Sequence, residues 1–144
     1  MAATAWTLYN KAKKKLANGT IKLGVDIFKM QLHTSASNAS TATLSTAASV
    51  TGEVANGSGY ATGGKSCASP TWTVGASAGQ YRFDSADLVW TATGGNIANI
   101  KFAVVKNSAG QALMWSRLTT AQFTLTINNT LTVQINVNGY FTLA

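Results

Sequence analysis

The chain has 144 residues, a formal net charge of +7 and only 10% charged residues. A typical soluble domain has about 25% charged residues, so the polar surface here must come mainly from Thr, Ser, Asn and Gly. Four acidic residues, one histidine and one cysteine leave few side chains from which a catalytic or metal site could be built. We therefore predict that the chain is not an enzyme and that it holds no cofactor or metal.

The length suits one domain with its own core, and a single cysteine cannot form an intramolecular disulfide. We expect no signal peptide, because no apolar run separates the start of the chain from its first lysines. No stretch approaches the roughly 18 apolar residues that suggest a membrane span. A single domain over residues 1–144 is the expected organisation.

The only helix is expected near the N-terminus, over about residues 4–18. Asn18 and Gly19 are typical of a helix end, because both tolerate a left-handed backbone. Apolar side chains recur at helical spacing at Trp6, Tyr9, Ala12 and Leu16.

After the helix the apolar period changes to two, which predicts a half-buried strand over 26–33 with His33 on its polar face. A long Ser/Thr/Gly-rich loop region is expected over about 34–69, with little apolar material to bury. Within it, Gly59 to Ser66 matches a phosphate-binding pattern, G-x-x-x-x-G-K-S. That loop needs a helix after it, and Pro70 blocks one. We interpret it as a glycine-rich surface loop.

Short strands separated by turn residues fill the rest of the chain. Asn107 to Gly110 predicts a turn, and Asn128-Asn129 predicts a tight hairpin between the last long alternating strands. The pattern indicates an all-β fold, a jelly-roll-like antiparallel β-sandwich with one short N-terminal helix. The expected strands cover 71–74, 80–83, 88–92, 100–105, 112–118, 123–127, 131–137 and 140–143.

Six lysines precede residue 30, and this basic end is the candidate partner-binding region. Its aromatics and lysines could bind nucleic acid, could pack the helix on the sandwich while the lysines face solvent, or could dock on a neighbouring subunit. All three remain open at this point, with nucleic acid disfavoured. The candidate contact residues are Trp6, Tyr9, Lys11, Lys13, Lys14 and Lys15.

One resemblance gives these features a context. The segment Tyr9-Asn-Lys-Ala-Lys-Lys-Lys-Leu-Ala-Asn-Gly-Thr-Ile-Lys-Leu23, followed by Asp26-Ile-Phe-Lys-Met-Gln-Leu32, resembles the opening of small structural proteins of tailed phages. Further pieces that fit are Glu53 to Tyr60, Phe83-Asp84, Asp87 to Trp90 and Lys101 to Val105. The resemblance spans about residues 6–105, whereas 119–144 match no such pattern.

The resemblance implies a virion protein without catalytic residues. Small jelly-roll members of that group resemble capsid decoration (cement) proteins, which bind the outside of the capsid lattice and bridge major capsid subunits. We therefore expect the major capsid protein and copies of this chain as partners, and no membrane. The expected location is the capsid surface, and the host cytoplasm during assembly.

Two alternatives remain. The chain could be a tail or baseplate component of the same particle. It could also be a carbohydrate-binding β-sandwich module, if two of Trp72, Trp90 and Trp115 share a solvent face.

Overall fold

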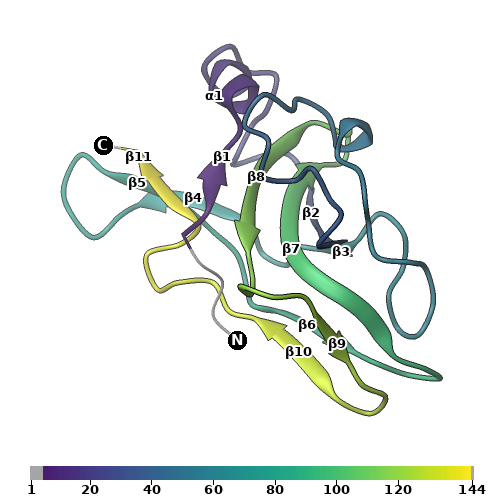
Figure 1. The fold of residues 1–144 in the computed structure, drawn as a ribbon. Helices are drawn as coiled ribbons and strands as arrows, with labels where there is room; N and C mark the ends of the chain where they lie inside the picture. Colours follow the sequence, from purple (N-terminus) through teal and green to yellow (C-terminus); the bar gives the residue numbers. More distant parts are fainter. Residues whose placement is uncertain (1–4, 144) are drawn as a thin grey trace.

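The computed structural model describes residues 5–143, which are built mainly from antiparallel strands (Figure 1). The helices are α1 (Asn10–Ala17) and a short 3₁₀ turn, η1 (Ala47–Ser49). The strands are β1 (Thr7–Leu8), β2 (Phe28–Thr34), β3 (Lys65–Ser66), β4 (Thr71–Val74), β5 (Tyr81–Asp84), β6 (Leu88–Thr91), β7 (Ile97–Asn107), β8 (Ala112–Arg117), β9 (Phe123–Leu125), β10 (Thr130–Val133) and β11 (Phe141–Leu143).

The strands form sheets of six, three and two strands, and all their pairings are antiparallel. The large sheet has the order β1-β8-β7-β2-β3, and β9 pairs with β7. The small sheets are β11-β5-β4 and β10-β6. This architecture confirms the predicted all-β antiparallel sandwich with one short N-terminal helix, and its β-rich layers fit the jelly-roll-like description.

The core lies where the large and small sheets meet. Strand β7 is the longest strand, and its segment from Phe102 to Val105 is buried residue after residue. Phe28 of β2 meets Phe83 of β5 edge-on, with ring centroids 5.0 Å apart. Both rings are fully buried, so this contact joins the three-stranded sheet to the main core.

The N-terminal helix is shorter than predicted. It begins at Asn10, and the preceding residues form β1, in which Leu8 pairs with Met114 of β8. Tyr9 continues this pairing through its backbone N–H, which donates to the carbonyl of Leu113 at 3.1 Å. Residues 7–9 therefore pair with β8 instead of forming helix, although their apolar side chains have helical spacing. Residue 4, the predicted helix start, lies outside the described residues.

The predicted hairpin over 123–137 is wrong. Asn128 does make the turn, with a left-handed φ of 70°, but the strands on either side have different partners. Strand β9 pairs with β7, and β10 pairs with β6. Ala92, the residue after β6, bonds to this turn. Its C=O accepts from Asn128 N–H at 2.8 Å, and its N–H donates to Asn129 C=O at 3.0 Å.

His33 is buried rather than on a polar surface, because the loop after β2 folds back over that face. His33 is only 1% exposed, and its backbone forms an isolated antiparallel β-bridge with Glu53. Thr34 N–H donates to Gly52 C=O at 2.8 Å, and Val54 N–H donates to Leu32 C=O at 2.9 Å. The loop therefore covers the face of β2 that the sequence pattern predicts to be exposed.

The region over 34–69 is mostly loop, as predicted, but it buries more than expected. It contains only η1 and the two-residue β3 as regular elements. Its apolar side chains nevertheless join the core, including Ala39, Val54 and Tyr60. The Lys15 ammonium group of α1 donates to Ser45 C=O at 2.8 Å and to Gln111 Oε1, which ties the loop to the helix.

The phosphate-binding pattern has no phosphate-binding structure. Lys65 and Ser66 form β3, and β4 follows instead of a helix. Gly64 has a φ of 82°, and a Cβ there would overlap the carbonyl of Met30. The segment is therefore a glycine-rich loop, as predicted, and Gly64 in addition allows the backbone to approach β2 closely.

Candidate protein-interaction surface

The three-stranded sheet β11-β5-β4 has one apolar face and one polar face. The cross-strand register places Trp72, Phe83 and Phe141 in one row, and Val74, Tyr81 and Leu143 in the next row of the same face. The other face carries Thr73, Arg82 and Thr142. Such alternation is expected of a sheet that covers something with one face only.

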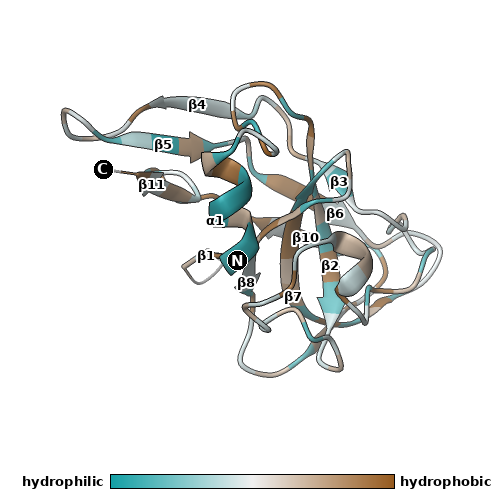
Figure 2. Cartoon of the chain, turned by 90° about the horizontal axis from the view of Figure 1, so that it is seen from above, coloured by the Kyte–Doolittle hydropathy of each residue, from teal (hydrophilic) through white to brown (hydrophobic). Residues whose placement is uncertain are grey.

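The two apolar rows differ in burial. The inner row continues the core, since Phe83 is fully buried and Trp72 lies 6.1 Å from Phe141 between ring centroids. The outer row extends past the core into solvent: Val74 is 58%, Tyr81 47% and Leu143 46% exposed. Figure 2 shows this sheet projecting to one side of the molecule, with β4 as its outermost strand.

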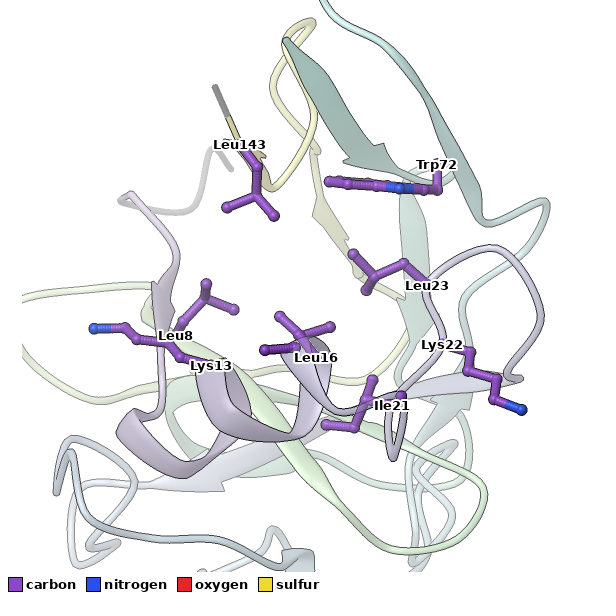
Figure 3. A pocket seen from close by; sticks show the side chains of 10 residues that line it. Leu8, Lys13, Leu16, Ile21, Lys22, Leu23, Trp72 and Leu143 are labelled. Atoms are coloured by element: carbon purple, nitrogen blue, oxygen red, sulfur yellow. The ribbon is translucent and has the colours of Figure 1, made fainter. Parts of the chain in front are cut away.

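A groove of about 400 Å³ separates the apolar face from helix α1. Figure 3 shows Leu8, Leu16, Ile21, Leu23, Trp72 and Leu143 around its open interior. Lys13 and Lys22 are also among the lining residues, and Figure 3 shows their side chains extending outward on opposite sides of the groove, away from its interior. The groove is thus apolar inside and basic at the edge.

The apolar surface continues beyond the groove. Gly24 lies against Trp72, since a Cβ built on it would be 4.0 Å from the Trp72 Cβ. The next residue, Val25, is 77% exposed, and Ile27 is 60% exposed. We call the exposed surface formed by Val25, Val74, Tyr81 and Leu143, together with the groove, the apolar shelf.

No family model matches the chain, and no curated protein or solved structure shows significant similarity to it. The resemblance of the N-terminal sequence to tailed-phage structural proteins therefore stays a prediction.

The predicted aromatic contact residues belong largely to the fold. Tyr9 is fully buried, and its hydroxyl donates to the carbonyl of Ala39 at 2.7 Å. Burial raises the pKa of the Tyr9 hydroxyl well above its usual range. Trp6 is half-buried and meets Tyr140 edge-on at 5.1 Å. These contacts remove Tyr9 from the residues that could touch a partner.

The four predicted contact lysines have different environments. Lys15 is half-buried and bonded to the 34–69 loop. Its pKa is lowered by desolvation and, to a smaller extent, by the charge of Lys11. Lys11, Lys13 and Lys14 are exposed on α1, and Lys13 reaches the apolar shelf. Of the four predicted contact lysines only Lys13 therefore lines the groove, and Lys22, which also lines it, was not among the predicted contact residues.

Burial shifts the pKa values of the buried cysteine and histidine. Burial raises the pKa of the Cys67 thiol to about 11, so the thiol stays protonated. Burial lowers the pKa of His33, against weaker opposing contributions from the Thr51 carbonyl and Glu53. Among residues 5–143, no three His, Cys, Asp or Glu side chains are grouped as a metal site would require.

The tryptophans do not form a sugar-stacking surface. Trp90 is 3% exposed. Trp115 is half-buried, packs on Phe102 with centroids 6.2 Å apart, and has an enclosed indole N–H. Trp72 lies in a different sheet from Trp115.

No helix within the described part of the chain has the length and apolar character to cross a bilayer.

The exposed outer row was not recognised from the sequence. Its signal was the period-two pattern of Trp72 and Val74 between threonines, which predicts one apolar face. The same pattern would arise if another element of the chain covered that face. Only the tertiary arrangement shows that Val74 and Tyr81 extend past their cover.

Proposed function

We propose that this protein is a virion structural protein that binds the outside of a phage capsid lattice and stabilises it by bridging major capsid subunits. The observation that carries the proposal is the apolar shelf, in which a sheet face extends from the core into solvent beside a basic helix. Several large apolar side chains exposed beside an apolar groove are typical of a protein-binding site.

The partner follows from the resemblance of residues 9–32 to tailed-phage structural proteins. A decoration protein needs a rigid body with a projecting contact surface and no chemistry. The β-sandwich supplies the body, and the three-stranded sheet supplies the projection. Copies of the chain would meet one another on the lattice, at the capsid surface, after assembly in the host cytoplasm.

The test is co-sedimentation of the purified protein with heads of its phage that lack it. Saturable binding in a fixed ratio to the major capsid protein is the expected result, and added protein should protect heads against thermal rupture. Absence of binding to heads would refute the decoration role. Binding to isolated tails instead would favour the tail or baseplate alternative.

A matched pair of variants connects the binding to the shelf. Val74 on β4 is 58% exposed, and Val89 on β6 is 40% exposed. Val74→Ser should weaken head binding, whereas Val89→Ser should leave it unchanged, because only Val74 belongs to the shelf. Equal effects of both variants would show that the shelf does not make the contact.

A further inference from the structure

We infer that β4 is a docking edge, to which an extended segment of another protein that carries both apolar and acidic side chains adds as a fourth strand of the small sheet. The inference deepens the proposed function and rests on it, since there the segment would belong to the major capsid protein. Three independent features of the structure lead to this partner.

The first feature is the free backbone edge of β4. Within residues 5–143 no strand pairs with the side of β4 opposite β5. Gly75 N–H donates to Gln80 C=O at 2.8 Å, so by antiparallel alternation Thr73 bonds to Arg82 of β5. The amide groups of Trp72 and Val74 must then point outward, where an added strand would bond to them.

The second feature is that this edge lacks the usual protection. Exposed edge strands normally carry lysine, an inward-pointing charge or proline, which prevent pairing with another chain. Strand β4 reads Thr-Trp-Thr-Val and has none of these; Pro70 precedes it. Two side chains of β4 contribute to the apolar face, so an added strand would place its own apolar side chains beside Trp72 and Val74.

The third feature is charge. Lys13 and Lys22 lie at the rim of the groove, and the chain has 11 basic against four acidic residues. Each of its four carboxylates already accepts hydrogen bonds from its own chain. The donors are Lys22 N–H and the Asn107 amide for Asp26, Tyr60 hydroxyl and Gly63 N–H for Glu53, Ser85 N–H for Asp84, and Ile135 N–H for Asp87.

The charge pattern favours a different protein over a second copy. Pairing two β4 edges would bring the groove lysines of both copies together, and each copy has only four acidic side chains to set against 11 basic ones. An acidic segment would instead meet Lys22, which follows Ile21 along the groove wall next to Leu23. A small apolar molecule in the groove would leave Val74 and Tyr81 exposed, whereas an added strand lies along both the groove and β4.

The experiment separates backbone pairing from side-chain packing. Val74→Pro removes the outward N–H of β4 without removing a bond to β5, and Val74→Thr keeps that N–H while adding polarity. Lys22→Glu reverses a rim charge, and Lys11→Glu makes the same change on the exposed side of α1. Thermal unfolding first establishes that all four variants fold. Binding is then measured by co-sedimentation with heads and, separately, with tails, both lacking this protein.

The expected result is that Val74→Pro and Lys22→Glu each weaken binding by about tenfold or more, while Val74→Thr, which loses only apolar contact, weakens it less than Val74→Pro does, and Lys11→Glu changes it little. Wild-type binding should also weaken as salt is raised. If the protein binds tails rather than heads with this same variant pattern, the decoration role fails but the docking edge stands.

Three results would overturn the inference. The first is head or tail binding that Val74→Pro leaves intact. The second is no binding to either particle fraction. The third is concentration-dependent self-association of the purified protein that Val74→Pro abolishes, because the occupant of the edge would then be a second copy.

Discussion

Replacing Gly64 with alanine should destabilise the protein strongly, and the size of the effect follows from two separate costs. Gly64 has a φ of 82°, a conformation that costs an L-residue about 1–2 kcal/mol. A Cβ at this position would also overlap Met30 C=O and lie 2.9 Å from Gln31 Cα. Both neighbours are backbone of β2, so β3 must move away, at about 1–3 kcal/mol more.

Gly63→Ala is the matched control. Gly63 has a similar φ of 93°, but nothing lies within 4 Å of its added Cβ. It should therefore incur only the conformational cost of about 1–2 kcal/mol. Urea unfolding followed by tryptophan fluorescence should show a free energy of unfolding lower for Gly64→Ala than for Gly63→Ala by about 1–3 kcal/mol.

Equal destabilisation by the two substitutions would refute the reasoning, since it would mean that β3 does not approach β2 as closely as described. A ligand experiment on the wild-type protein tests whether this loop binds phosphate groups. Millimolar ATP should not raise the unfolding temperature of the wild-type protein, because a ligand stabilises a fold only when it binds the native state. A clear rise would show that the loop binds nucleotide after all.

Three further predictions concern buried polar groups. Tyr9→Phe should lower the free energy of unfolding by about 1–3 kcal/mol, because it leaves the buried carbonyl of Ala39 without its donor; a loss below measurement error in urea unfolding would contradict this. For His33, burial lowers the folded-state pKa, so the unfolded chain binds a proton first. Stability should therefore fall as the pH drops below about 6.5, the ordinary histidine pKa, and the fall should be shallower in His33→Gln; pH-independent stability between pH 7 and 5.5 would argue against it. The Cys67 thiol, with a pKa of about 11 and little exposure, should react with iodoacetamide at pH 8 far more slowly in the native protein than in urea, and equal rates would show that it is accessible.

Local sequence patterns predicted best the strands and turns whose structure is determined by residues close together in the sequence. The prediction for 71–74 matches β4, and the Asn107–Gly110 turn joins β7 to β8 as expected. In both cases the residues that determine the structure are near neighbours in sequence. Turn chemistry and period two were therefore sufficient.

The errors occur where distant segments compete for the same backbone. Asn128 forms its turn, but Ala92 occupies the hydrogen-bonding positions that a β9–β10 hairpin would need. His33 alternates onto a polar face, yet residues 51–54 return to cover that face. Neither effect leaves a local pattern in the sequence, because each depends on which remote segment bonds to the edge in the folded structure.

The candidate site was predictable only in its charge. The lysines of residues 11–22 indicate a basic surface, but the sequence does not show that Lys15 is bonded to Ser45 or that Tyr9 is enclosed. The apolar half of the site needs residues from β1, α1, β4 and β11 together. The groove is open because of where each of these elements ends. Element boundaries are the part of a fold that sequence patterns predict least well.

The distribution of charge constrains how copies of the chain could meet on a lattice. The carboxylates hold turns and loop ends inside each copy: Asp87 accepts from Ile135 N–H, and Glu53 accepts from Tyr60 and Gly63. Acidic side chains are also few, four against 11 basic ones, so pairs of opposite charge between copies can balance only a minority of the lysines and arginines. Contacts between copies should therefore be apolar or uncharged, and the excess of lysines should be matched by acidic groups on a different protein.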